Sequence, residues 1–199
     1  MRCLVLADAL REQGRSSLFL CGPLPAGLDA LVRERGHELY VLPRGCDDPG
    51  GWAADAGTSC AQLREAGAVA CVVVDHYCLD ARWEARLRAA TGARIMAVDD
   101  IADRPHDCDL LLDQNLYADM PGRYATLVPA ACNALLGPHY TLLDRRFRQL
   151  RGDRARGEGA VRRLLVSFGG SDPPDLTSAT LRALRGTGFA GLQVDVVLG

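Results

Sequence analysis

The sequence predicts an α/β protein built on a doubly wound, parallel, Rossmann-like sheet, and three observations lead to this fold class. Short apolar runs that favour strands alternate with helical runs, several of which end at glycine. The strand runs, such as CVVV and RIMAV, are apolar throughout, which is typical of parallel strands that helices cover on both faces. The chain has 199 residues, 48% of them hydrophobic, which is enough for one full domain, or for one domain and a piece of a second.

The elements follow in order from the first residues. Gly14 and Gly36 end the first two helical runs, and a segment rich in Gly, Asp and Pro predicts a loop from Arg44 to about Gly57. The segment after residue 115 up to ALLGPHY is expected to be irregular. The helices are expected over 2–13, 28–35, 60–66 and 81–90, and the strands over 17–20, 38–43, 70–75, 94–100 and 109–115.

A polar, glycine-containing stretch, RGDRARGEGA, divides the chain. It follows a charged helix over 144–149 and predicts a linker. After it come a strand, a tight loop, a helix over 176–184 and a last strand. We expect a Rossmann-like domain over 1–151 that lacks its first strand, a linker over 152–161, and over 162–199 the first β-α-β unit of a second Rossmann-like domain.

The expected absence of an opening strand leaves one position of the first sheet unfilled. Doubly wound domains normally begin with a strand, whereas this sequence begins in a helical run. An exposed strand edge can pair with another chain. The sequence therefore predicts self-association through this edge.

Charge and apolar patterning exclude several classes of function. All 23 basic residues are arginine, and 25 acidic residues balance their charge. Because the chain has no excess of basic residues, no nucleic-acid partner is predicted. No apolar run approaches the roughly 20 residues that cross a bilayer, so no membrane association is expected. The first helical run carries Asp8 and Glu12, unlike a signal peptide, and a cytoplasmic protein is predicted.

The cysteine pattern predicts buried thiols rather than a metal site or a disulfide framework. Eight cysteines are scattered along the chain, with no C-x-x-C pair and no histidine at metal-ligand spacing. We expect no metal and no cofactor.

Polar clusters follow three consecutive strands of the predicted sheet. Because parallel strands end at the same edge, these clusters predict a polar cleft there. Imidazole can accept a proton near neutral pH and a phenol can bind a substrate hydroxyl, but each carboxylate can also cap a helix and the histidine can be satisfied by backbone. Asp80 is interpreted as such a helix cap. The three clusters are Asp75-His76-Tyr77, Asp99-Asp100 and Asp113-Gln114-Asn115.

Two further loops have the composition of ligand sites. His139 follows a Gly-Pro turn and could face a ligand. The run Gly169-Gly170-Ser171-Asp172 lies between a strand and a helix, where glycine amides and a helix N-terminus favour phosphate. The alternative is a glycine turn required by geometry alone, because the run is neither a Walker loop nor G-x-G-x-x-G.

Five runs, in order, resemble a known family: RCLVLADALREQG, VVVDHYCLDARWE, IMAVDDIADRPHDCDLLLDQN, LLGPHYTLL and RRLLVSFGGSDPPDLT. They are similar to the UDP-sugar hydrolases of pseudaminic acid biosynthesis, a family of the two-domain GT-B group that is close in architecture to the glycosyltransferase that makes lipid II. The resemblance extends from Met1 to Gly199. It implies hydrolysis of a UDP-linked diacetamido-trideoxy sugar to UDP and the free sugar, by attack of water at the anomeric carbon.

The resemblance also implies roles for individual residues. Tyr77 and His76 correspond to the catalytic region, with Tyr77 at the sugar. The diphosphate would lie against Gly169, Gly170, Ser171 and Asp172. The substrate cleft would be lined by Asp75, Asp100, Asp113, Gln114, Asn115, His139 and Tyr140.

Two departures from the family pattern limit these expectations. The family's general-base histidine belongs to a Gly-x-Gly-His loop immediately before the run that starts here at Met1, and its uridine-binding loops follow the point where this sequence ends. We therefore expect a chain truncated at both ends with little or no hydrolase activity. The alternatives are a related GT-B glycosyltransferase, a magnesium-dependent phosphotransfer domain using Asp75, Asp99 and Asp100, and a non-catalytic sugar-binding or interaction module.

Overall fold

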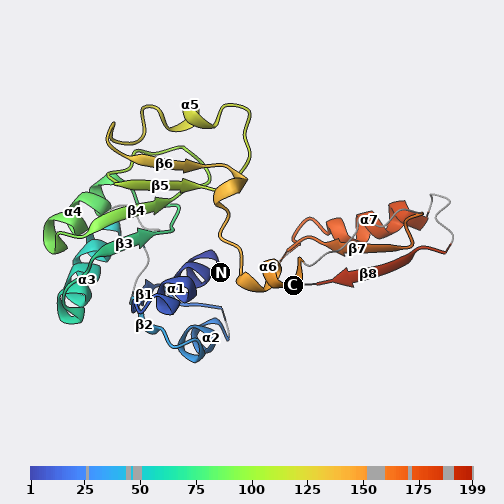
Figure 1. Cartoon of the computed structure of the whole chain (residues 1–199), viewed down its shortest axis with the longest axis horizontal. Coiled ribbons are helices and arrows are strands. Elements are labelled where there is room, and N and C mark those ends of the chain that lie inside the picture. Colours follow the sequence, from blue (N-terminus) through green and yellow to red (C-terminus); the bar gives the residue numbers. More distant parts are fainter. Residues whose placement is uncertain are drawn as a thin grey trace. The chain divides into compact units, whose positions relative to one another are not determined.

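The computed structural model describes residues 1–25, 27–43, 46, 51–151, 160–169, 172–185 and 191–198. The chain divides into two compact units, Met1–Arg148 and Gln149–Gly199, and each is described by itself (Figure 1). The predicted linker over 152–161 lies outside the described residues except for its last two. No helix in the described part is long and apolar enough to span a membrane.

The first unit alternates helices with parallel strands. Its strands form two hydrogen-bonded groups, β1-β2 and β3-β4-β5-β6. The elements are α1 (Arg2–Glu12), β1 (Leu18–Cys21), α2 (Leu28–Glu34), β2 (Glu38–Val41), α3 (Gly51–Ala66), β3 (Cys71–Val74), α4 (Ala81–Thr91), β4 (Arg94–Val98), β5 (Leu110–Asp113), α5 (Met120–Tyr124), β6 (Asn133–Leu136), the 3-10 turn η1 (Pro138–Tyr140) and α6 (Arg145–Leu150), which reaches the boundary.

The register of the four-stranded sheet brings the carboxyl ends of its strands to one edge. Val74 of β3 is opposite Ala97 of β4, and Val98 is opposite Leu112 of β5. Asp113, the last residue of β5, is opposite Leu136 of β6. The polar residues that follow these strands are therefore neighbours, as the sequence predicted.

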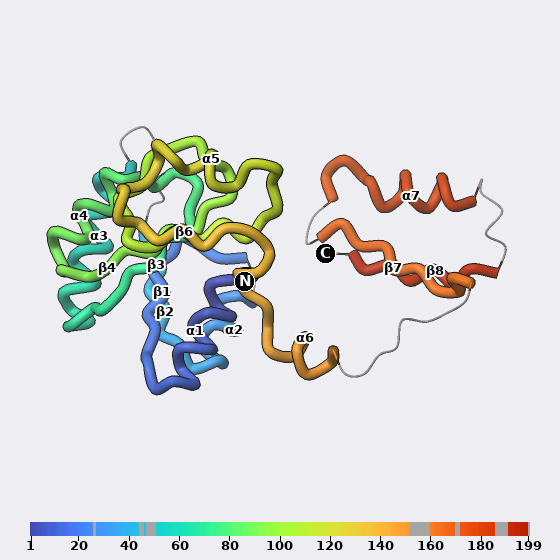
Figure 2. The backbone as a smooth tube through the Cα atoms, turned by 45° about the horizontal axis from the view of Figure 1, so that its top comes forward, coloured from blue at the N-terminus to red at the C-terminus, as the bar shows by residue number. Residues whose placement is uncertain are grey.

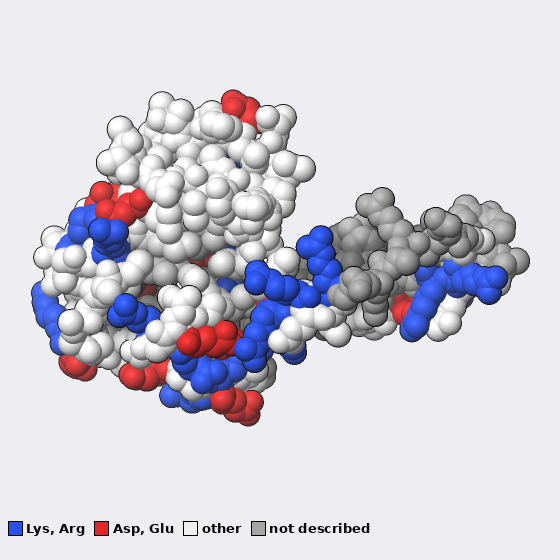
Figure 3. Space-filling model, in the orientation of Figure 1, with Lys and Arg blue, Asp and Glu red and all other residues white. Residues whose placement is uncertain are grey.

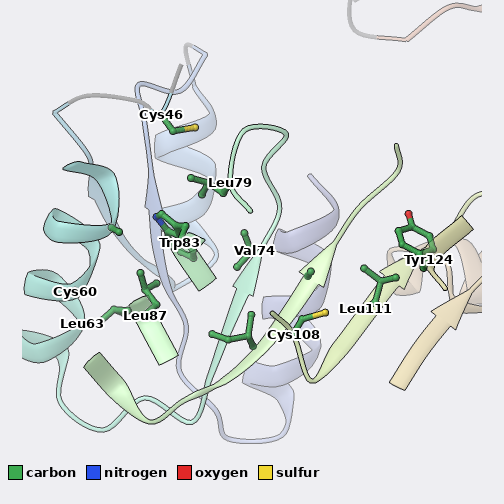
Figure 4. Packing of buried hydrophobic residues seen from close by; sticks show 13 residues of the cluster. Cys46, Cys60, Leu63, Val74, Leu79, Trp83, Leu87, Cys108, Leu111 and Tyr124 are labelled. Atoms are coloured by element: carbon green, nitrogen blue, oxygen red, sulfur yellow. The ribbon is translucent and has the colours of Figure 1, made fainter. Parts of the chain in front are cut away.

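Alternate residues of the strands face two different apolar layers. Ile95 and Ala97 of β4 belong to a cluster with Leu87 of α4 and residues of α3 (Figure 4). Met96 and Val98 belong to a second cluster, against which Leu6 of α1 packs. Helices thus cover both faces of the sheet, which confirms the doubly wound class.

The predicted loop from Arg44 to about Gly57 lies outside the described residues at 44–45 and 47–50. From residue 51 onward the prediction is wrong, because α3 begins at Gly51. The buried Asp55 accepts a hydrogen bond from Nε1 of Trp83 at 2.8 Å, and Ala56 is fully buried. Trp83 of α4, the partner of Asp55, is 28 positions away in sequence. Composition alone indicated a loop, but tertiary packing extends the helix.

The segment over 133–136 is a strand, β6, and not irregular as expected. It pairs in parallel with β5 over its whole length. Its short run NALL carries too weak a pattern to predict a strand, and the neighbouring edge of β5 supplies the hydrogen bonds that form it.

The second unit is a single β-α-β arrangement. Its elements are β7 (Arg163–Ser167), α7 (Leu176–Arg185) and β8 (Gln193–Val197), with β7 and β8 parallel (Figure 2). Among its described residues only Val166 and Thr177 are buried. Large apolar side chains such as Leu165 and Val197 are exposed.

Candidate functional site

A polar cluster, which we call the carboxylate cluster, lies where β3, β4 and β5 end. It consists of Asp75, Asp99, Asp100 and Asp113 with the groups that contact them. Arg2, the first residue of α1, joins two of its members. The guanidinium donates two hydrogen bonds to Asp75, at 2.7 and 3.0 Å, and two to Asp100, both at 2.8 Å. This arrangement holds two strand ends at a fixed separation.

The Arg2 guanidinium controls protonation in this part of the site. Burial alone raises the pKa of Asp75, but hydrogen bonds from Arg2 and Cys3 and the charge of Arg2 outweigh it and hold the pKa below its usual value. Burial and the adjacent Asp75 raise the pKa of the Cys3 thiol to about 12. Asp75 is therefore a stable carboxylate and Cys3 a neutral thiol at physiological pH.

The open side of the cluster carries neutral hydrogen-bonding groups. Nδ2 of Asn115 donates to Asp100 at 3.0 Å and to Asp113 at 3.1 Å. The Tyr77 hydroxyl lies 3.5 Å from Oδ2 of Asp100, and this side chain is 61% exposed. A phenol, an amide and a carboxylate thus meet at an accessible surface, which is a suitable set for binding hydroxyl and amide groups of a ligand.

A buried layer supports the accessible one. The Tyr124 hydroxyl contacts Asp113 at 2.9 Å and Asp99 at 3.1 Å, and burial together with these carboxylates raises its pKa. Burial raises the pKa of Asp99, but the backbone N–H of Ala102 and the charge of Arg104 more than offset it, so its pKa is lowered. Tyr124 therefore remains a hydroxyl donor that ties β4 to β5.

The loop after β3 is held by backbone contacts. Arg104 donates to the carbonyl oxygens of His76 and Leu79, both at 2.8 Å. The Asp80 side chain accepts from the backbone N–H of Arg82 at 2.9 Å and caps α4, which confirms the predicted cap. Nδ1 of His76 accepts the backbone N–H of Cys78 at 3.1 Å. The prediction that the backbone satisfies His76 therefore holds for one of its two ring nitrogens, Nδ1.

Three other residues that were predicted to contact the substrate, Gln114, His139 and Tyr140, make the contacts described below with residues outside the carboxylate cluster. Oε1 of Gln114 accepts the backbone N–H of Leu142 at 3.2 Å, so this side chain fixes a neighbouring segment. His139 and Tyr140 form an edge-to-face pair with ring centres 5.2 Å apart, exposed at the end of β6.

The predicted diphosphate loop is described only in part, since Gly170 and Ser171 lie outside the described residues. Gly169 is exposed and has a φ of +86°, a conformation that favours glycine. The Asp172 carboxylate accepts the backbone N–H groups of Leu176 and Thr177 at 2.9 and 2.8 Å. It therefore caps α7 and occupies amides that an anion would otherwise use.

Arginines complete the site, and the sequence analysis missed them. Arg123 donates to the carbonyl oxygen of Asp100 at 3.0 Å and stacks on the Tyr117 ring at 3.6 Å. Arg2, Arg104 and Arg123 come from three separate segments without a motif, and the one available signal is that so many carboxylates need cations. On the face of the first unit shown in Figure 3, arginines and acidic residues are interspersed.

The magnesium pocket suggested as an alternative is not favoured by this geometry. The position between Asp75 and Asp100 is bridged by Arg2, and Arg104 lies 3.0 Å from the buried Asp99. These guanidinium groups already provide the positive charge that a cation would supply.

Comparisons with known proteins agree with the resemblance seen in the motifs. No family model matches the chain. Over 78 residues the chain is 36% identical to the UDP-2,4-diacetamido-2,4,6-trideoxy-beta-L-altropyranose hydrolase of Campylobacter jejuni subsp. jejuni, a match that covers 39% of this chain and 28% of the hydrolase. The chain is therefore similar to an enzyme of nucleotide-sugar chemistry over about a quarter of that enzyme's length.

Comparison of structures shows the fold. The crystal structure of MurG from Acinetobacter baumannii superposes with a TM-score of 0.55 at 13% identity, covering 100% of this chain and 63% of that one. A short-chain dehydrogenase from Streptomyces avermitilis reaches a TM-score of 0.37, which is too low to support an argument. The likeness to MurG confirms the Rossmann-like fold of GT-B type.

Proposed function

We propose that this chain acts in the hydrolysis of a UDP-linked diacetamido-trideoxy sugar, and that the carboxylate cluster binds the sugar. The observation that carries the proposal is the accessible group of Tyr77, Asn115 and Asp100, positioned at the carboxyl ends of the strands in a GT-B-type fold. Ligands of open α/β sheets bind at this edge. The sequence similarity to a UDP-sugar hydrolase supports the choice of substrate.

The charges of the cluster favour the sugar over the diphosphate. The four carboxylates of the cluster are matched by three guanidinium groups, those of Arg2, Arg104 and Arg123. The remaining negative charge repels an anion, whereas sugar hydroxyl and acetamido N–H groups are donors that carboxylates accept. The diphosphate would then be held outside the carboxylate cluster.

The cluster is better suited to binding and orienting a sugar than to deprotonating water. Both carboxylates with a shifted pKa, Asp75 and Asp99, have it lowered, which makes them weak bases. UDP is a good leaving group, so positioning of the sugar and water accounts for much of the rate enhancement. In this proposal Tyr77 contacts a sugar hydroxyl, Asn115 and Asp100 orient it, and Arg2 keeps Asp75 ionised.

Calorimetric titration with the UDP-sugar, the free sugar and UDP tests the proposal. We expect the sugar-containing ligands to bind and Tyr77→Phe to weaken binding by about 2- to 10-fold, as for loss of one hydrogen bond. Tyr40→Phe, which changes a tyrosine of β2, is the matched control and should bind as the unmodified chain does. Failure of both sugar ligands to bind would contradict the proposal.

A UDP-release assay separates the remaining alternatives. Release without an acceptor supports hydrolysis, whereas release only when an acceptor is added indicates a glycosyltransferase. Binding of the sugar with no UDP release in either case indicates a non-catalytic sugar-binding module, in line with the little or no hydrolase activity expected from the sequence.

A further inference from the structure

Three potential metal ligands, Cys46, His76 and Cys78, meet beside the loop that carries Tyr77. One ligand atom of each lies within 4.8 Å of those of the other two. Sγ of Cys46 is 3.3 Å from Nδ1 of His76 and 3.7 Å from Nε2. We propose that these three residues form a binding site for a soft divalent cation, Zn²⁺ in the first place.

The separation of one ligand pair is close to that expected in a tetrahedral zinc site. With Zn–S of about 2.3 Å and Zn–N of about 2.0–2.1 Å, sulfur and nitrogen ligands on a tetrahedron lie roughly 3.6 Å apart. Sγ of Cys46 is 3.3 Å from Nδ1, slightly closer than this value, and 3.7 Å from Nε2, so the sulfur lies over the face of the imidazole ring and the ring turns when Nδ1 ligates the ion. Cys78 is exposed, and its side chain can turn toward the same point. Thiolate and imidazole ligands select zinc over magnesium or calcium, which prefer oxygen.

Cys46 and the loop that carries His76 are each held in position without a metal. The backbone of Cys46 is packed so closely against Gly51 that a Cβ at residue 51 would lie 3.1 Å from it. The loop with His76 is fixed by Arg104, which donates to its carbonyl oxygen at 2.8 Å. A site whose ligands are held in place loses less conformational entropy on binding the ion.

The tautomer of His76 suits ligation through Nδ1. Because Nδ1 accepts the backbone N–H of Cys78, the ring proton belongs on Nε2 and the Nδ1 lone pair is available for a cation that replaces this hydrogen bond. Each cysteine that ligates releases its thiol proton to solvent, so affinity rises with pH. Three protein ligands leave a fourth position for water or another small ligand.

No motif in the sequence predicted this site. Cys46 is 30 residues from His76, which is not a recognised metal-ligand spacing. The fold brings Cys46, which lies between β2 and α3 in sequence, against the loop after β3. Because Tyr77 lies between two of the ligands, a bound ion would fix the segment that the proposed function assigns to the sugar. The metal site itself does not depend on that function.

Cobalt substitution tests the site on the intact chain under a non-chelating reductant. We expect one equivalent of Co²⁺ to give the intense visible bands of a tetrahedral site and a thiolate charge-transfer band, and Zn²⁺ to displace it. Cys78→Ser should remove much of the charge-transfer intensity and weaken Zn²⁺ binding by at least about tenfold, since loss of a direct ligand exceeds the usual cost of an outer-shell change.

Two cysteine variants outside the cluster serve as matched controls. Cys71→Ser changes an exposed cysteine of β3, and Cys132→Ser changes a cysteine whose sulfur is 3.5 Å from that of Cys108. Both should keep the cobalt spectrum, and circular dichroism checks that all variants fold. Absence of a tetrahedral spectrum, an unchanged spectrum in Cys78→Ser, or its loss in Cys132→Ser would overturn the proposal.

Discussion

The two units use similar sequence patterns with very different results. In Met1–Arg148 the apolar strands are covered on both faces, and residues such as Leu87 and Leu111 are fully buried. In Gln149–Gly199 the strands β7 and β8 have one buried apolar residue, Val166, among the described residues, while Leu165 is 66% exposed. Apolar strands therefore create a core only where helices from more than one β-α-β unit meet over them.

The difference extends to the polar residues. In the first unit, carboxylates at strand ends are tied by arginines from distant segments, and two of them, Asp99 and Asp113, are buried. In the second unit the corresponding carboxylate, Asp172, contacts only its own helix among the contacts described. A site assembled from several strand ends needs the sheet that the first unit has.

The largest expected effect is on the core of the first unit. Leu87→Ala removes a fully buried side chain between α3 and α4, and should lower the free energy of unfolding by about 2–5 kcal/mol. Denaturant unfolding followed by tryptophan fluorescence reports this directly, because Trp83 lies in the same cluster. A change below about 1 kcal/mol would show that this core is loosely packed.

The next effect is on the link between strand ends. Arg2→Met leaves Asp75 and Asp100 without their shared cation and should cost about 1.5–3 kcal/mol at pH 7, the range for charged hydrogen bonds. Because the pKa of Asp75 is lowered in the folded chain, this stabilisation is present above its unfolded value near 3.8 and is lost as the pH falls through the folded pKa.

Measurement of the free energy of unfolding at two pH values checks the direction of this pH dependence. The stability gap between the unmodified chain and Arg2→Met should shrink on going from pH 7 to pH 3. Arg82→Met, which removes an exposed partner of Asp80, is the matched control and should have a smaller effect. A gap that widens in acid would contradict the assignment.

A smaller, local effect is expected at the start of α7. Asp172→Ala removes the acceptor for the N–H groups of Leu176 and Thr177, so these amides should exchange with solvent several-fold faster. Those backbone hydrogen bonds lower the pKa of Asp172, so the cap should persist at mildly acidic pH. Amides of β4 and β5 serve as the internal reference, and equal acceleration there would show that the units are not independent.

The smallest effect should come from the exposed apolar surface of the second unit. Leu165→Ala removes a side chain that buries little area and should change stability by less than about 0.5 kcal/mol. It is the direct counterpart of Leu87→Ala, measured in the same way. A loss above about 2 kcal/mol would show that Leu165 is covered in solution.

The sequence predicted those parts of the molecule that depend on local pattern. The apolar runs located β3, β4 and β5, and the order of the parallel strands placed Asp75, Asp100 and Asp113 together. The Asp-Ala step before α4 predicted its cap. These inferences need only the periodicity of strands and the chemistry of helix ends.

Features that depend on distant contacts were not predictable. The extension of α3 to Gly51 depends on Trp83, and β6 depends on the edge of β5. Arg2 reaches residues 73 and 98 positions away, and Cys46 meets His76 across 30 positions. A single sequence carries no signal for such pairs, because their proximity is a product of the completed fold.

Residue-resolved titration with the free diacetamido-trideoxy sugar tests the central claim most directly. In two-dimensional NMR spectra, we predict that the sugar shifts the amide signals of Tyr77, Asp100 and Asn115, while those of β7 and β8 stay unchanged. The shifts should saturate and be reduced in Tyr77→Phe. Shifts confined to the second unit, or none at the ends of β3 to β5 at saturating sugar, would contradict the assignment of the carboxylate cluster to the sugar.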